Sequence, residues 1–255
     1  MTETTPAPDA DAAAAGSRAP YTERPERILV VAAHPDDADF GVAGTIAGWV
    51  RAGSVARLVC CTSGDAGADD AATDPLELAR RREGEQRDAA AVVGYDEVVY
   101  LHRPDGALEN DLALREELVR IIRQFRPDAV VTMDPTVVVV ENSFIQHTDH
   151  RAAGMAALDA VYPAARNAMA FPNLVLHEGL APHDVNLIYL YFSERPTDWV
   201  DVTSTLDVKL AALGRHVSQL RKPAELEQRI RDWAAEDGAA IGAAAAESFR
   251  VVRIG

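Results

Sequence analysis

The sequence predicts an α/β protein with an open, mostly parallel sheet that is flanked by helices and followed by an elaborated C-terminal half. Short, continuous apolar runs of strand length alternate with segments in which apolar residues recur at helical spacing. Polar or glycine-containing turns separate the two kinds of segment. This alternation is typical of βαβ units, whose crossovers produce a parallel sheet with ligands at the carboxyl ends of its strands.

Four apolar runs in the first half are predicted strands: residues 28–33, 55–61, 98–101 and 129–133. Helical patterns lie between them. The first pattern has Val42, Ile46 and Trp49 on one face and Gly53 at its C-terminal end. In the second, Asp74 and Pro75 give a strong start signal for a helix that extends to Gly94. The third covers residues 114–125.

The second half predicts a less regular arrangement on the same Rossmann-like scaffold. It comprises a short helix from 149 to 162, a strand at 187–192, a helix over 206–220, a helix starting near 223 and an edge strand at 249–254. No internal repeat or composition shift marks a boundary. The prediction is therefore a disordered tail over residues 1–24, which are rich in Ala, Pro, Thr and Asp, and a single domain over 25–255.

Charge and composition exclude several classes of partner. The chain has 255 residues and a formal net charge of -15, which disfavours nucleic acid and anionic membrane surfaces. No apolar run is long enough for a membrane span, and the start lacks the pattern of a signal peptide. The adjacent cysteines Cys60 and Cys61 give no disulfide framework. These features predict a cytoplasmic protein that binds a small molecule, and they leave homo-oligomerisation open.

Two clusters of polar residues fall where the predicted fold places ligands. His34-Pro35-Asp36-Asp37 follows the first strand, and His147-Thr148-Asp149-His150 lies at the start of a helix. A catalytic zinc commonly takes three ligands from His, Asp and Glu and keeps one position for water. Together the clusters could supply three ligands with an acid and a base to spare. Each cluster alone could equally be a turn or a helix cap.

These residues resemble a known family. Ala33-His34-Pro35-Asp36-Asp37, followed by Gly44-Thr45-Ile46 and later by His147-x-Asp149-His150, is similar to the zinc-dependent PIG-L type, or LmbE-like, de-N-acetylases. The similarity covers residues 27–220. It departs from the common pattern at Ala38 and at Thr148. Members of the family deacetylate N-acetylglucosamine conjugates.

The resemblance implies a role for each residue of the two clusters. His34, Asp37 and His150 would bind zinc or another divalent metal, and Asp36 would be the general base. His147 would stabilise the oxyanion and protonate the leaving amine, with Asp149 orienting its ring and keeping it charged.

Two further residues are predicted to bind substrate. Arg82 has either this role or a loop-anchoring role, and it could equally form a surface pair with Glu85, one helical turn away. Asp105, ahead of Gly106, is expected either to bind a sugar hydroxyl or to form a turn.

The predicted function is therefore a metal-dependent hydrolase that removes an acetyl or other acyl group from the nitrogen of an N-acetylglucosamine-type conjugate. Two alternatives remain open at this point. One is an amidase that cleaves a larger amide, such as a thiol conjugate. The other is a non-catalytic sugar-binding module on the same fold, which would not need a carboxylate beside the metal ligands.

Overall fold

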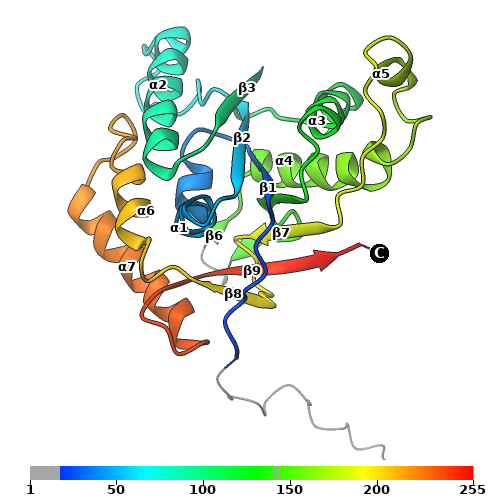
Figure 1. Cartoon of the computed structure of the whole chain (residues 1–255). Coiled ribbons are helices and arrows are strands. Elements are labelled where there is room, and N and C mark those ends of the chain that lie inside the picture. Colours follow the sequence, from blue (N-terminus) through cyan, green and yellow to red (C-terminus); the bar gives the residue numbers. More distant parts are fainter. Residues whose placement is uncertain (1–17, 141, 143, 255) are drawn as a thin grey trace, which may run out of the picture.

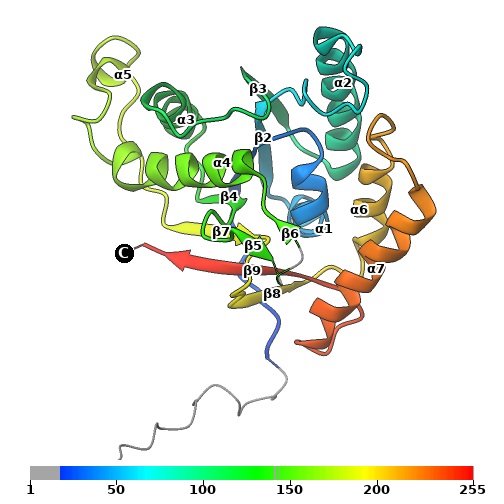
Figure 2. The same cartoon turned by 180° about the vertical axis from the view of Figure 1, so that it is seen from behind.

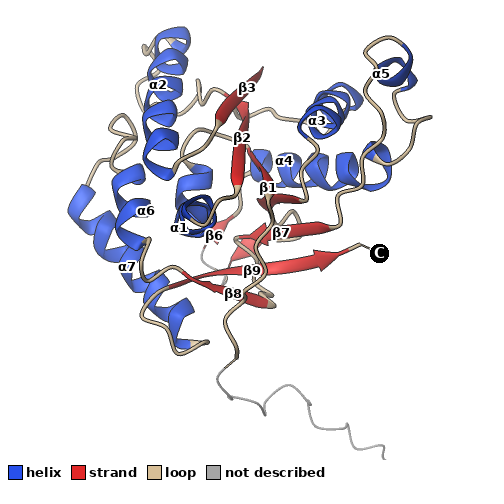
Figure 3. Cartoon of the chain, in the orientation of Figure 1, coloured by secondary structure: helices blue, strands red, loops and turns tan. Residues whose placement is uncertain are grey.

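A seven-stranded sheet runs through the middle of the molecule with helices on both faces (Figure 1, Figure 3). The computed structural model describes residues 18–140, 142 and 144–254. The strand order is β3-β2-β1-β4-β7-β9-β8. The strands are β1 (Arg27–Ala32), β2 (Val55–Thr62), β3 (Glu97–Arg103), β4 (Ala129–Met133), β7 (Leu187–Tyr191), β8 (Asp198–Asp201) and β9 (Ala246–Arg253). The first five in this order are parallel, which confirms the predicted α/β class.

The helices form two layers, one on each face of this sheet (Figure 2). They are α1 (Asp37–Arg51), α2 (Pro75–Val93), α3 (Leu112–Phe125), α4 (Thr148–Asp159), α5 (Pro172–Leu176), α6 (Leu206–Leu213) and α7 (Pro223–Ala239), with a π-helical turn, Ala160–Ala165, after α4. Helices α1, α2 and α6 pack together on one face, and α3 and α4 pack on the other. Strand β1 is buried because both faces are covered, so its run is continuously apolar.

The start and end of α2 follow from its sequence. The side chain of Asp74 accepts a hydrogen bond from Leu76 N at 2.9 Å, and Pro75 occupies the first turn, where its missing N–H costs nothing. Gly94 ends the helix with a φ of 100°, a conformation that glycine adopts without strain.

The C-terminal half differs from the prediction in the extent of one helix and in the number and order of its strands. Helix α6 ends at Leu213 instead of continuing to residue 220, and Val217 is exposed. Strand β9 lies between β7 and β8 instead of at the edge. The actual edge strand, β8, was not predicted because its four residues are too short to show a periodic pattern. The same holds for the hairpin of β5 (Val139–Val140) and β6 (Phe144–Ile145).

Residues 18–24 contact the body of the protein, although the sequence placed them in the tail. Tyr21 N donates to Trp199 O at 2.8 Å, and the hydroxyls of Tyr21 and Tyr189 are 2.7 Å apart. The guanidinium of Arg18 lies 4.5 Å from the centre of the Trp199 ring. Contacts made by single side chains leave no periodic pattern in the sequence, so the composition of residues 18–24 did not predict that they would pack on the domain. Residues 1–17 lie outside the described residues.

Helix α4 approaches the carboxyl end of β4 very closely. A Cβ atom added at Gly154 would lie 2.4 Å from the carbonyl oxygen of Met133, so only glycine allows this approach. The contact brings the N-terminal turn of α4 to the edge of the sheet where β1 ends.

No helix in the described part of the chain is long and apolar enough to cross a bilayer.

Candidate metal centre and active site

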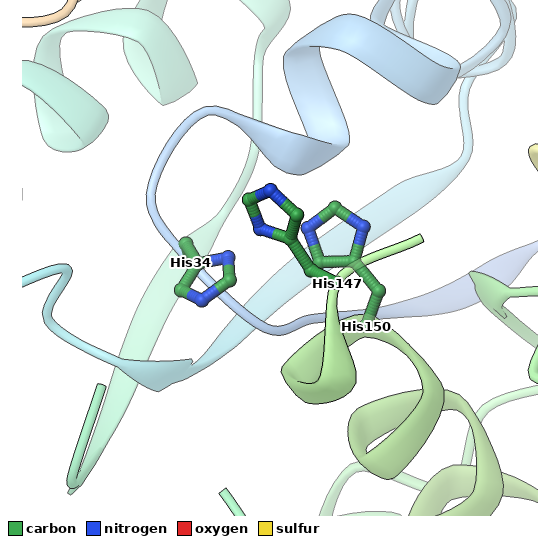
Figure 4. A group of neighbouring side chains, drawn as sticks. All are labelled: His34, His147 and His150. Atoms are coloured by element: carbon green, nitrogen blue, oxygen red, sulfur yellow. The ribbon is translucent and has the colours of Figure 1, made fainter. Parts of the chain in front are cut away.

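The two polar clusters of the sequence meet at the carboxyl edge of the sheet. His34 lies in the loop after β1, whereas His147 and His150 lie at the start of α4 (Figure 4). One nitrogen from each of these three rings lies within 4.8 Å of the others. Residues more than 100 positions apart in the chain are thus brought together by the parallel pairing of β1 with β4.

The carboxylate of Asp37 bridges two of these histidines. Its Oδ1 lies 3.0 Å from His150 Nε2, and its Oδ2 lies 3.3 Å from His34 Nδ1. Oδ2 also accepts a hydrogen bond from the backbone N–H of His34 at 2.7 Å. The other ring nitrogen of His150, Nδ1, lies 3.0 Å from Gln146 Oε1, which fixes the orientation of the ring. The three predicted metal ligands therefore form one buried cluster.

Two more aspartates lie on the opposite side of the His34 ring. Asp105 Oδ1 and Asp149 Oδ2 lie 3.0 and 3.3 Å from His34 Nε2. Asp149 also accepts hydrogen bonds from the backbone N–H groups of Gly106 and Leu108, at 2.7 and 3.2 Å. A carboxylate behind a ligating histidine is the usual arrangement around protein-bound metals.

The predicted pairing of Asp149 with His147 differs from the structure. Within the described residues, the hydrogen bonds of the Asp149 carboxylate go to His34, to the loop after β3 and to Thr148, and none goes to the His147 ring. Asp149 lies in the first turn of α4, where its short side chain reaches the loop after β3 instead of the His147 ring. Asp105 likewise contacts His34 and accepts from Ala66 N at 2.9 Å.

The charges of this cluster require a compensating cation. Burial alone would lower the pKa of His34, but the charge of Asp37 and the hydrogen bonds to Asp105 and Asp149 raise it to about 12. The pKa of the Asp37 carboxyl lies below its usual range because His150 and His34 outweigh its burial. Either a proton on His34 or a divalent ion between the side chains supplies the positive charge that these carboxylates need. The imidazole and carboxylate groups of His34, Asp37 and His150 therefore fit a metal such as zinc.

Asp36 lies beside this cluster as the residue that precedes α1. Its φ of 95° is a left-handed value that L-residues rarely adopt. Burial and the charge of Asp37 raise its pKa to about 6, against the lowering effects of Arg82, His216 and His34. A carboxylate with a pKa near neutrality is suited to accept a proton at neutral pH.

Arg82 joins three segments at the edge of the cluster. Its Nη2 donates to Pro35 O at 2.8 Å and to Asp36 Oδ2 at 3.3 Å, and its Nη1 donates to Gly64 O at 3.0 Å. The residue is only 5% exposed. The alternative of a surface pair with Glu85 is wrong, because Glu85 bonds to Ser218 instead.

A buried hydrogen-bond chain, which the sequence pattern did not predict, holds the backbone of Asp36. Asp36 N donates to Gln86 Oε1 at 2.7 Å, and Gln86 Nε2 donates to Asp39 Oδ2 at 2.8 Å. His216 Nε2 lies 2.8 Å from the same oxygen. We call Gln86, Asp39 and His216 the Asp36 support chain. One signal in the sequence is that Arg82 and Gln86 are polar residues on the otherwise apolar face of α2.

Gln86→Leu is expected to lower kcat by about 10- to 100-fold, because small displacements of a catalytic group have effects of this size. The substitution leaves the N–H of Asp36 without its acceptor while keeping a side chain of similar volume. Steady-state kinetics and metal content measure the effect. Glu85→Gln is the matched control, since Glu85 lies on the same helix and contacts the segment after α6 through Ser218. Equal losses in the two variants would contradict a role in positioning Asp36.

His147 lies against the cluster on the side of the cavity. Its ring centroid is 4.8 Å from that of His150 and 6.2 Å from that of Phe144. Burial and the neighbouring His150 and His34 lower the pKa of His147, and the charges of Asp37 and Asp149 oppose this lowering without overcoming it. His147 also offers a nitrogen to the three-histidine group, which makes it an alternative ligand.

An α/β fold that gathers imidazoles and carboxylates at the carboxyl edge of its sheet defines a candidate metal-dependent hydrolase. The family model described as GlcNAc-PI de-N-acetylase, PIG-L, matches residues 29–161, and the chain belongs to this family. The resemblance in the two motifs is thereby confirmed.

The relatives are deacetylases. The chain is 31% identical over 229 residues to a diacetylchitobiose deacetylase from Thermococcus kodakarensis, which covers 89% of this chain and 83% of the relative. A deacetylase of 1D-myo-inositol 2-acetamido-2-deoxy-alpha-D-glucopyranoside from Mycobacterium sp. (strain KMS) is 28% identical over 230 residues. This alignment covers 76% of this chain and 74% of the relative. The structure of the N,N'-diacetylchitobiose deacetylase from Pyrococcus horikoshii superposes with a TM-score of 0.82 at 30% identity. The superposition covers 90% of this chain and 84% of that structure.

Proposed function

We propose that this protein is a metal-dependent hydrolase that removes the acetyl group from the nitrogen of an N-acetylglucosamine-type conjugate. The observation that carries the proposal is the cluster of His34, Asp37 and His150 with Asp36 beside it. The membership of the chain in a family whose relatives are N-deacetylases supports the same reaction.

His34, Asp37 and His150 are proposed to hold the metal, with zinc the preferred ion. Two imidazoles and one carboxylate are a ligand set typical of catalytic zinc. When bound, the ion supplies Lewis acidity to the amide carbonyl and to water. Asp149 and Asp105 hold the His34 ring from its far side. This role for Asp149 replaces the predicted support of His147.

Asp36 is proposed as the general base. It accepts a proton from the attacking water, whose oxygen forms a bond to the acetamide carbon. The C–N bond then breaks, acetate leaves, and the amine nitrogen takes up a proton. Arg82 keeps the Asp36 carboxylate directed at the site through their contact at 3.3 Å, and we propose this positioning role instead of direct substrate binding.

His147 is proposed to act on the other side of the amide. Its ring lies within the same cavity as Asp36 and packs against His150. From there its ring N–H stabilises the developing negative charge on the carbonyl oxygen, and the ring relays to the leaving amine the proton that Asp36 took from the water. Asp105 lines the same cavity, and a contact with a sugar hydroxyl is compatible with its bond to His34.

The proposal extends to the catalytic domain, the class of substrate and the location of the protein. Residues 25–255 are proposed to be a single catalytic domain. The substrate is a small-molecule amino-sugar conjugate and not a nucleic acid or a membrane. The protein is proposed to act in the cytoplasm.

The test is incubation of the purified protein, loaded with zinc, with N,N'-diacetylchitobiose and with a methyl glycoside of N-acetylglucosamine. Equal amounts of acetate and free amine are expected from at least one of them. Turnover of larger N-acyl groups with none of acetamides would favour the amidase alternative. Binding of both sugars by the metal-loaded protein without any acetate release would favour the non-catalytic module.

A further inference from the structure

The cavity at the metal centre extends well beyond the space that an acetamido sugar needs. Its volume is about 1190 Å³, above the range of roughly 300 to 1,000 Å³ that is typical of small-molecule sites. Besides the residues of the metal centre, it is lined by Phe40, one turn after Asp36 on α1, and by Arg229, Trp233 and Glu236 on α7. A second group would therefore lie between α1 and α7 when the acetamide is at the metal centre.

Aromatic rings form the wall of this extension. Trp233 on α7 lines the cavity with 51% of its surface exposed. The guanidinium of Arg229, one turn earlier, lies 5.3 Å from the centre of the indole ring and holds it from one side. Phe40 lines the same space. Exposed, immobilised aromatic faces are suited to pack against the apolar C–H face of a pyranose ring.

The charges around this extension are mainly negative. Glu236 and Asp237 line it from α7, and Glu194 lies in its wall after β7. Two cations, Lys209 and Arg229, also line it. The ammonium of Lys209 is 2.7 Å from Glu247 Oε1 in a buried ion pair, and the guanidinium of Arg229 lies over the Trp233 ring. Since carboxylates outnumber cations among the residues that line the extension, its local potential disfavours an anionic group.

We propose that Phe40, Arg229, Trp233 and Glu236 form a distal subsite that binds a neutral or cationic sugar ring joined to the acetylated glucosamine and excludes anionic aglycones. The proposal rests on the proposed deacetylase function and narrows its substrate class to neutral or amino-sugar saccharides. Trp233 supplies the stacking surface, and Glu236 supplies the charge selection. The distal subsite determines specificity and takes no part in bond breaking.

Three substrates separate the effect of a second sugar ring from the effect of negative charge on the aglycone. A methyl glycoside of N-acetylglucosamine has no second ring, N,N'-diacetylchitobiose has a neutral one, and N-acetylglucosaminyl malate carries two negative charges. The disaccharide is expected to have a kcat/KM at least tenfold above that of the methyl glycoside, mainly through KM. The malate conjugate is expected to fall below both. A malate conjugate that matches the disaccharide would overturn the charge selection.

Variants at the distal subsite test the residues themselves. Trp233→Ala is expected to raise KM for the disaccharide about tenfold and to leave the methyl glycoside unchanged, because one stacked ring is lost. Trp233→Phe should restore most of the affinity. Glu236→Lys should raise kcat/KM for the malate conjugate. Leu176→Ala, at an exposed position on α5 away from this cavity, is the matched control.

The outcomes distinguish this proposal from the proposed function. If Trp233→Ala impairs the methyl glycoside as much as the disaccharide, the distal subsite is wrong while the deacetylase function stands. If no substrate is turned over, the deacetylase function fails. Calorimetric titration of chitobiose into the zinc-loaded protein then decides on the distal subsite, which is refuted if wild type and Trp233→Ala bind it equally or neither binds.

Discussion

Asp36→Asn is expected to lower kcat by about 100-fold or more, the size of effect that follows the loss of a general base. Asparagine has nearly the same shape as aspartate and tolerates a positive φ, so the backbone before α1 should be retained. It cannot accept a proton from water. KM should change little, because the lost interaction belongs to the transition state. Steady-state kinetics on the acetylated sugar measures both constants.

Two controls support this reading of Asp36→Asn. Metal content should remain at the wild-type level, since Asp36 is not among the proposed ligands. The thermal midpoint should stay close to that of the wild type. A variant that keeps near-normal turnover with its metal bound would remove Asp36 from the role of base, and the reaction would need another proton acceptor.

Removal of the metal is expected to abolish activity, with a loss on the order of 1,000-fold, because a bound ion contributes several kcal/mol to transition-state stabilisation. Dialysis against a chelator should give this loss, and added zinc should reverse it. Asp37→Ala should have the same effect without a chelator, since its carboxylate bridges His34 and His150. Metal analysis of the purified variant measures the content per chain.

His147→Ala is the comparison that decides between the two ligand sets of the site. If His34, Asp37 and His150 hold the metal, His147→Ala retains it and loses kcat. The three-histidine group offers the alternative in which His147 is itself a ligand. Loss of metal in His147→Ala together with retention in Asp37→Ala would establish that alternative.

The parallel part of the fold was predictable because its strands are covered on both faces. Strand β1 is continuously apolar after Arg27, β2 and β4 are mostly apolar, and the turns between strands and helices carry strong signals such as Asp74-Pro75. The C-terminal half gives weaker signals. Strand β8 is four residues long, and β9 obtains its place between β7 and β8 from pairing alone. Local periodicity carries no information about that order.

The same distinction holds for the site. His34, Asp37 and His150 could be predicted because a metal site needs particular residue types, which stand out in a sequence with seven histidines. The partner of Asp149 could not, because a short side chain in the first turn of a helix reaches whichever loop folds against it. The Asp36 support chain likewise joins three segments through tertiary contacts.

The positive φ of Asp36 means that part of the stability of this protein is given up to maintain its reaction geometry. A non-glycine residue held in a sparsely populated backbone region costs about 1 to 3 kcal/mol. Asp36→Gly and Asp36→Ala both lack the carboxylate, so a comparison of the two isolates this backbone cost. Glycine loses more backbone entropy on folding than alanine does, which offsets part of this difference. Asp36→Gly should still be more stable than Asp36→Ala by about 1 kcal/mol, or roughly 2 to 4 °C in thermal midpoint. Backbone strain alone would therefore favour glycine at position 36, and the aspartate marks a position where activity is maintained at a cost in backbone strain.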